Sequence, residues 1–193
     1  MINGHLAGLR ARHPDDVAVL HAELYDDVYT HSRANAQPWR PLPLAGGHSP
    51  YEPAAPPEKA DLFSVVDLAS GELAGEAVLW GIDTHNRSAH LGLSLRPGSR
   101  GRGFGAEVVQ LLCRYGFTLR GMNRLQVETL ADNTAMRRAA GAAGFVLEGT
   151  LRGSGWVYGA FVDEVILGLL AADWTEPDLK AAAEARAQAG PRS

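Results

Sequence analysis

The segment from His90 to Leu119 constrains the fold more than any other part of the chain. Leucines alternate with small or polar residues over His90–Arg96, which predicts a strand with one apolar face. A run rich in glycine and arginine follows, and apolar residues then recur at helical spacing as far as Leu119. A strand, a glycine loop and an amphipathic helix in this order predict an α/β (α+β) domain.

The glycine loop also carries chemistry. Gly101, Gly103 and Gly105 stand where the helix begins. Free backbone N–H groups and the positive end of the helix dipole favour an anion there, such as a pyrophosphate. Arg100 and Arg102 add charged donors. The loop therefore predicts a phosphate cradle, without choosing the cofactor that it holds.

Three common catalytic motifs do not fit this chain. Gly101-x-Gly103-x-x-Ala106 matches the dinucleotide fingerprint, but residues 120–124 include no acid for the ribose, which disfavours NAD. The chain has only two lysines, Lys59 and Lys180, and neither lies in a Gly-Lys-Ser/Thr sequence, which excludes P-loop kinases and GTPases. The sequence also contains no Gly-x-Ser-x-Gly nucleophile elbow.

Composition narrows the class of protein further. The 193 residues, 46% of them hydrophobic and 21% charged, are enough for one domain with its own core, expected over residues 1–175, with an alanine-rich tail over 176–193. One cysteine, Cys113, excludes an internal disulfide, and no Cys/His spacing predicts a metal site. The net charge of -4 argues against DNA binding. Without a signal peptide or an uncharged run of membrane length, we expect a cytoplasmic protein.

The remaining elements follow from periodicity and from helix and turn signals. In chain order they are a strand over His5–Arg10, a helix from Pro14 with an apolar stripe to Val28, a hairpin of Leu62–Asp67 and Glu72–Asp83, a strand over Leu125–Leu130, a helix over Thr134–Ala143, strands over Phe145–Leu151 and Phe161–Leu170, and a short helix near Asp178–Ala189. Seven of the eleven prolines lie in Pro38–Pro57, which predicts a loop that is either a substrate lid or a plain surface connection.

Arg100-Gly101-Arg102-Gly103-Phe104-Gly105 resembles the Arg/Gln-x-x-Gly-x-Gly/Ala pyrophosphate motif of the GNAT acyl-CoA N-acetyltransferases. The resemblance covers nearly the whole chain and points to the RimJ/RimL branch. The segments that carry this part of it are Val127-Glu128-Thr129, Asn133-Thr134-Ala135, Gly144-Phe145-x-x-Glu148-Gly149-x-Leu151-Arg152, Asp163 and Trp174.

The resemblance implies the GNAT fold, a mixed and mostly antiparallel central sheet flanked by helices and splayed between its fourth strand, His90–Arg96, and its fifth, Leu125–Leu130. Acetyl-CoA is then the co-substrate, with its pantetheine arm in the gap between these strands and no metal required. By the same resemblance the residues that hold it are the backbone groups of Leu93 and Leu95, the loop residues Arg100, Gly101, Arg102, Gly103, Phe104 and Gly105, and Asn133.

Two side chains are candidates for the acyl transfer itself. Glu128 could take the proton of the acceptor amine, directly or through water, and the alternative is a solvated or ion-paired carboxylate. Ser94 could hydrogen-bond the acceptor or the thiol, or be a surface serine. Many relatives place a tyrosine general acid seven residues after the asparagine, where this chain has Ala140. Ser94, Tyr158 or a water could then return the proton, or the low pKa of a thiol makes an acid unnecessary.

The acceptor site is the least readable part of the sequence. Trp39, Tyr51, His90 and Tyr158 are the candidates; aromatic side chains on strands are more often core, and His90 could instead act as a base. We expect an N-acetyltransferase that moves an acyl group directly from acyl-CoA to a primary amine, of a protein N-terminus or a small molecule, in a ternary complex. A carrier-bound donor, a non-catalytic CoA-binding module and a homodimer stay open; DNA and membranes are not expected partners.

Overall fold

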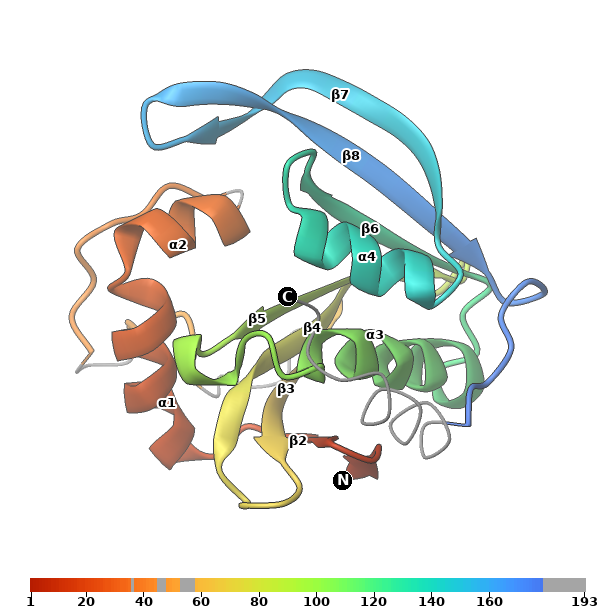
Figure 1. Cartoon of the computed structure of the whole chain (residues 1–193), viewed down its shortest axis with the longest axis horizontal. Coiled ribbons are helices and arrows are strands. Elements are labelled where there is room, and N and C mark those ends of the chain that lie inside the picture. Colours follow the sequence, from red (N-terminus) through yellow and green to blue (C-terminus); the bar gives the residue numbers. More distant parts are fainter. Residues whose placement is uncertain (36, 45–47, 53–57, 179–193) are drawn as a thin grey trace.

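The computed structural model describes residues 1–35, 37–44, 48–52 and 58–178, and over these residues it forms one sheet of eight strands (Figure 1). The strands lie in the order β1-β2-β3-β4-β5-β6-β8-β7, and every neighbouring pair is antiparallel except β5 and β6. Their bounds are β1 (Ile2–Asn3), β2 (Ala7–Ala11), β3 (Ala60–Asp67), β4 (Leu73–Asp83), β5 (Ser88–Leu95), β6 (Arg124–Leu130), β7 (Val146–Val157) and β8 (Ala160–Leu170). The predicted mixed, mostly antiparallel α/β fold is confirmed.

The helices lie in the segments between these strands. Their bounds are α1 (Pro14–Leu20), continued by a π-helical turn over His21–Tyr25, α2 (Val28–Ala34), a 3-10 turn over Pro97–Ser99, α3 (Phe104–Arg114), continued by a π-helical turn over Tyr115–Leu119, and α4 (Thr134–Ala142). None of the helices in the described part of the chain is long and apolar enough to cross a membrane.

One helix prediction was wrong at its end. Val28 was expected to continue the apolar stripe of the first helix, but it is the first residue of α2. The break occurs because the Asp27 side chain accepts the backbone N–H of Thr30 and so caps a new helix. The new direction carries α2 away from the sheet edge toward the C-terminal hairpin (Figure 1).

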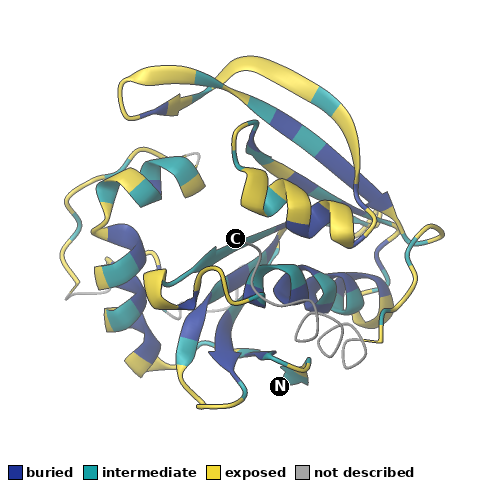
Figure 2. Ribbon diagram, viewed as in Figure 1, coloured by how far each residue is buried: buried dark blue, intermediate teal, exposed yellow. Residues whose placement is uncertain are grey.

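Helices cover both faces of the sheet, and strand parity shows which helix lies on which face. Val65 of β3 is buried in the main core together with Val108 of α3. Its neighbour Ser64 points the opposite way and donates to Asp16 of α1 at 2.7 Å. The middle strands are buried, whereas β7 of the C-terminal hairpin is largely exposed (Figure 2). Its partner β8 still contributes Val165, Leu167 and Leu169 to the core.

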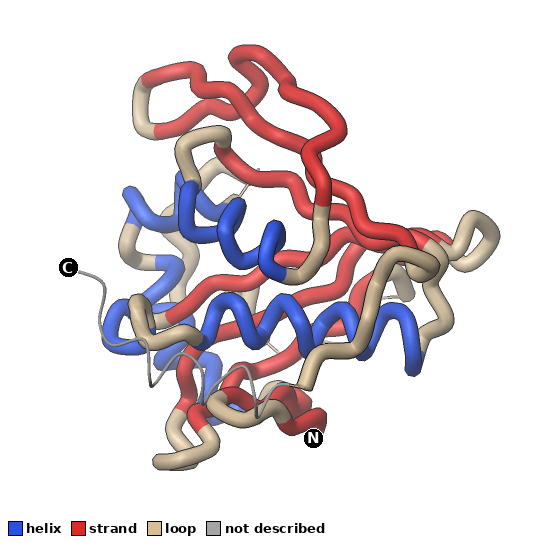
Figure 3. Tube along the Cα trace, turned by 45° about the vertical axis from the view of Figure 1, so that its right-hand side comes forward, coloured by secondary structure: helices blue, strands red, loops and turns tan. Residues whose placement is uncertain are grey.

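The sheet opens between β5 and β6. These strands pair only at Ser88↔Arg124, Ala89↔Leu125 and His90↔Gln126. Beyond this point β5 stays paired with β4 as far as Leu95, and β6 stays paired with β8 as far as Leu130 (Figure 3). The predicted splay is therefore confirmed, and two strand edges face the gap without a strand between them.

The C-terminal hairpin is longer than the sequence predicted. β7 was expected to end at Leu151, but it reaches Val157, because a register shift between Leu151 and Gly155 absorbs the intervening residues into the ladder. The added length carries the hairpin tip to α2, where the rings of Tyr158 and Tyr29 meet edge to face at 5.7 Å between centroids. The predicted helix near Asp178–Ala189 lies, apart from Asp178, outside the described residues.

Candidate active site

The loop between β5 and α3 has the backbone that a phosphate cradle needs. Gly101 and Gly103 adopt positive φ of 73° and 90°, a region that L side chains rarely enter. Gly103 caps α3, and the N–H groups of the first helical turn have no acceptor within the helix. Phe104 is 2% exposed and packs in the core, so it offers a ligand only its backbone. Its side chain anchors the start of α3 in the core.

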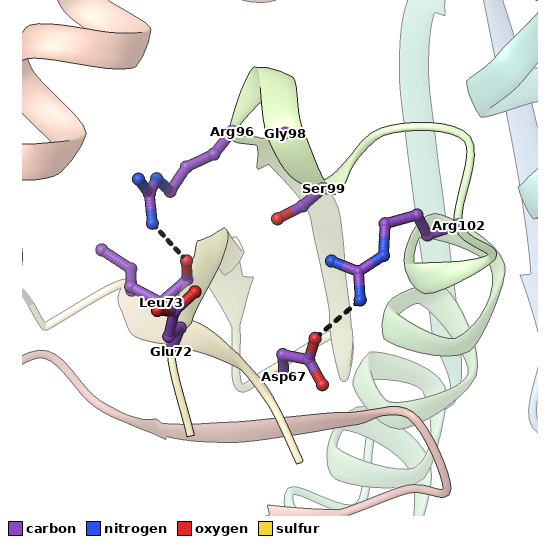
Figure 4. Close-up of a pocket in the computed structure, with 7 residues that line it drawn as sticks. All are labelled: Asp67, Glu72, Leu73, Arg96, Gly98, Ser99 and Arg102. Carbon is purple, nitrogen blue, oxygen red and sulfur yellow. Dashed lines mark hydrogen bonds and ion pairs between the residues drawn. The ribbon is translucent and has the colours of Figure 1, made fainter. Parts of the chain in front are cut away.

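The two loop arginines are tied to the protein itself. Arg102 forms an ion pair with Asp67 at 2.9 Å (Figure 4). Its guanidinium also lies over the Phe104 ring, 5.0 Å from the ring centroid. The Arg100 Nε donates to the carbonyl of Leu95 at 3.0 Å. A backbone N–H from Ala69, helped by Arg102, holds the pKa of Asp67 below its usual range. These contacts hold the loop to the ends of β3 and β5.

A small polar pocket lies beside the loop (Figure 4). Its lining residues are Asp67, Glu72, Leu73, Arg96, Gly98, Ser99 and Arg102. The cations in it are already engaged, because Arg96 binds the Glu23 carboxylate and the Leu73 carbonyl while Arg102 binds Asp67. The hydrogen bonds from Arg96 and Arg102 in the pocket wall therefore hold the loop to the ends of β4 and β3.

The edge of β5 that borders the gap carries the backbone groups of Leu93 and Leu95. The Arg96 N–H donates to the carbonyl of Ala74 on β4 at 2.9 Å. Backbone groups alternate sides along an antiparallel strand, so those of Leu93 and Leu95 point away from β4, toward the gap. This is the orientation that their predicted contact with a pantetheine arm requires.

Asn133 stands at the start of α4, across the gap. Its Oδ1 accepts the N–H of Met136 at 3.2 Å, and its Nδ2 donates to Thr129 Oγ1 at 3.0 Å. Both ends of the amide thus hold the turn from β6 into α4. A further contact with a cofactor stays a prediction. Ala140, at the position of the usual tyrosine, is fully buried in the core.

Glu128 and His90 meet where the strands part. His90 Nδ1 lies 3.4 Å from Glu128 Oε1, and the imidazole stacks on Trp80 with 4.3 Å between ring centroids. Ser94 lies on the same face of β5 as His90, two positions beyond Gly92. The structure thus places the predicted catalytic residues on one face of the opening, and Trp80 forms the wall behind His90.

Sequence reasoning missed one charged pair on this face. Glu76 of β4 is the register partner of Ser94 and pairs with Arg12 at 2.8 Å. Burial raises the pKa of Glu76, and the guanidinium of Arg12 opposes this shift. No local motif signals the pair, because its members are 64 positions apart and meet only when β2, β3 and β4 form the sheet.

The four predicted acceptor residues do not form one cluster. His90 borders the gap, whereas Tyr51 is 5% exposed within a second core cluster under α1, and Trp39 packs against that cluster. Tyr158 is 70% exposed at the hairpin tip. Burial raises the pKa of Tyr51, which lies beneath the Arg12 guanidinium. Trp39 and Tyr51 thus belong to the second core cluster, and the Tyr51 ring packs against Arg12, the partner of Glu76. Tyr158 instead joins the hairpin to α2.

A sheet that splays beside a glycine loop at a helix N-terminus defines the acyl-CoA-binding class of acetyltransferase folds. The chain belongs to the acetyltransferase (GNAT) family, whose domain model matches residues 7–146.

Sequence comparison finds relatives among bacterial proteins. An uncharacterized N-acetyltransferase p20 of Bacillus licheniformis is 31% identical over 112 residues, which are 58% of this chain and 63% of that protein. The match therefore spans just under two thirds of that relative's length. A putative ribosomal N-acetyltransferase YdaF of Bacillus subtilis is 29% identical over 55% of this chain and 58% of its own length.

Solved structures share the fold at low sequence identity. Spermidine N-acetyltransferase from Vibrio cholerae, in complex with CoA and spermine, superposes with a TM-score of 0.78 at 21% identity, over 87% of this chain and 97% of that one. The ribosomal L7/L12 α-N-protein acetyltransferase RimL, in complex with CoA, gives 0.70 at 19% identity, over 88% and 97%.

Proposed function

We propose that this protein is an N-acetyltransferase that moves an acetyl group from acetyl-CoA to a primary amine by direct transfer in a ternary complex. The observation that carries the proposal is the gap between β5 and β6, with a positive-φ glycine loop at one end and Glu128 with His90 at the other. From Leu95 to His90 the strand spans about 17 Å. An extended pantetheine arm has a comparable length.

The donor side rests on the chain's own backbone. The N–H groups at the start of α3 receive the pyrophosphate, and the free edge of β5 at Leu93 and Leu95 receives the arm. Two structural neighbours are described as CoA complexes, which supports the same donor here. When bound, acetyl-CoA supplies the thioester carbonyl, the electrophile of the reaction.

The acceptor side needs a group that takes a proton from the amine. Glu128 is suited to this role, because its carboxylate lies at the opening and is 38% exposed at the side chain. The amine nitrogen forms a bond to the carbonyl carbon, its proton passes to Glu128, and the carbon–sulfur bond breaks. The proton returns to the departing sulfur through water or Ser94, and a thiol's low pKa reduces the need for a stronger acid.

The acceptor is an amine on a small molecule or a protein N-terminus. The neighbours act on a polyamine in one case and a ribosomal protein in the other, by their names. Both amine classes therefore belong in the test. The polar contacts around Glu128 are built from side chains on β5 and β6, which favours a catalyst over a non-catalytic CoA-binding module.

The experiment is a thiol-release assay with acetyl-CoA against polyamines, N-terminal peptides, amino acids and aminoglycosides, with calorimetric CoA binding measured in parallel. Release with one acceptor class, lost in Glu128→Gln while CoA affinity stays the same, is the expected result. CoA binding without release from any acceptor would support the non-catalytic module, and no CoA binding would point to a carrier-bound donor.

A further inference from the structure

A chain of polar side chains runs along the acceptor face of β6 and ends at Glu128. Arg124, Gln126 and Glu128 share this face because they are two residues apart. Arg124 Nη1 donates to Glu148 Oε1 of β7 at 2.8 Å, and Arg124 Nη2 donates to Gln126 Oε1 at 3.0 Å. Gln126 Nε2 then donates to Glu128 Oε1 at 2.7 Å.

The chemistry of the chain allows only one orientation of the Gln126 amide. The guanidinium of Arg124 has donors alone, so it requires the amide oxygen. The ionised carboxylate of Glu128 has acceptors alone, so it requires the amide nitrogen. A flipped amide would turn both contacts repulsive. Arg124 therefore fixes the direction in which Gln126 presents its N–H to Glu128.

The two oxygens of Glu128 are consequently unequal. Oε1 accepts from Gln126 and faces His90 Nδ1 at 3.4 Å. Within the described part of the chain, no residue bonds to Oε2. The held oxygen fixes the carboxylate plane, and the other is left for an acceptor amine.

The end of this series of hydrogen bonds that lies farthest from Glu128 depends on the local structure of β7 and β8. Glu148 is the extra residue of a bulge in β7, since the register moves from Leu147↔Leu167 to Gly149↔Ile166. Its carboxylate crosses β8 above Gly168 to reach Arg124; a Cβ at Gly168 would lie 2.3 Å from Glu148 Oε1. A bulge on one strand and a glycine on the next thus make room for one ion pair.

We propose that Gln126 is a positioning residue of this enzyme, which holds one oxygen of Glu128 so that the other meets the amine. The inference rests on the proposed function, in which Glu128 takes the proton. Gln126 is suited to the task because its backbone is the last rung that joins β6 to β5. The charged or titratable groups around Glu128 are His90 from β5, Arg124 on β6, Glu148 from β7 and, two register positions away on β8, Glu164.

The test is Gln126→Met, which keeps the side chain's length and removes its donor. We expect kcat to fall about tenfold, the value of one hydrogen bond to a charged group, while the Kd for acetyl-CoA stays the same. The KM for the acceptor should change less than kcat does, because the substitution disturbs the orientation of the base and not the binding surfaces. Gln110→Met on α3 is the matched control, and it should leave kcat unchanged.

Two remote variants test the same chain without touching Glu128. Gly168→Ala should displace Glu148, and Glu148→Gln should weaken its hold on Arg124; each should lower kcat by less than Gln126→Met does. Thermal melting checks that each variant folds. If Gln126→Met does not fold, the kinetics of the two remote variants test the proposal instead. A normal kcat in Gln126→Met beside an inactive Glu128→Gln would overturn this proposal alone. A fully active Glu128→Gln would overturn both it and the assigned base.

Discussion

His90 and Gln126 are the last pair of residues at which β5 and β6 are joined. Just beyond them the two strands separate, and each leaves a backbone edge toward the gap. Their side chains lie on the acceptor face, where His90 stacks on Trp80 and Gln126 bonds to Glu128. The polar side chains of the acceptor face therefore lie together at the point where the sheet opens.

The loop glycine Gly103 should be essential for the donor. Gly103→Val places a β-branched side chain at φ 90°, in the left-handed region, at the first turn of α3. The strain and the added bulk should weaken acetyl-CoA binding at least tenfold, on the order of 1.4 kcal/mol, measured by calorimetry. Gly159→Val is the matched control, because Gly159 also has positive φ, 93°, and open space around it at the hairpin tip. Equal CoA affinity in both variants would argue against the cradle.

Asp16 should make stability depend on pH. Burial tends to raise the pKa of Asp16, but hydrogen bonds from Arg10, the His13 N–H and Ser64 outweigh this and lower it. The folded pKa therefore lies below the unfolded value of about 3.9. The resulting stabilisation is complete above that value and is lost as pH falls below it.

Asp16→Asn is the variant that shows this. At pH 7 it should lower the free energy of unfolding by about 2 kcal/mol, measured by urea denaturation, and the difference from the parent should shrink as pH falls below about 4. Asp15→Asn, at an exposed neighbouring carboxylate, is the control. A difference that grows toward low pH would contradict the assigned sign.

The Cys113 thiol should not react with thiol reagents in the folded protein. The thiol is fully buried, and burial raises its pKa to about 12, so almost no thiolate is present at neutral pH. Addition of a disulfide reagent to the native protein should give no fast colour, whereas the urea-unfolded chain should give one equivalent. Fast reaction of the native protein would mean that α3 opens easily. A silent Cys113 also leaves the thiol-release assay free of background.

The ion pair between Arg33 of α2 and Asp132, at 2.6 Å, should add little to stability. Asp132 is 61% exposed, and exposed pairs contribute under about 1 kcal/mol. Arg33→Met should therefore change the unfolding free energy by less than this amount. Urea denaturation of the parent and the variant measures this difference. A loss well above about 1 kcal/mol would show that the pair stabilises the contact between α2 and the turn after β6.

Local patterns predicted the elements that surround the glycine loop. Alternating leucines placed β5, helical spacing placed α3, and the turn at Gly71 placed the hairpin of β3 and β4, because each signal lies within a few neighbouring residues. The break at Asp27 was missed because the apolar stripe of the first helix continues to Val28 past the Asp27 cap. The extension of β7 past Leu151 was missed because the hairpin tip is set by contacts between distant segments, such as Tyr29 with Tyr158.

By itself the sequence determined the glycine loop at the start of α3, the elements on either side of it and the presence of Glu128 on a strand, since periodicity and backbone freedom are properties of neighbouring residues. The mixed sheet was implied by the resemblance to a known family. Only the tertiary structure decided that Gln126 bonds to one oxygen of Glu128, that Glu148 reaches Arg124 across Gly168, and that Tyr51 is buried. The physical reason is that strand register and side-chain packing join residues far apart in the chain. Their partners exist only once the sheet has formed.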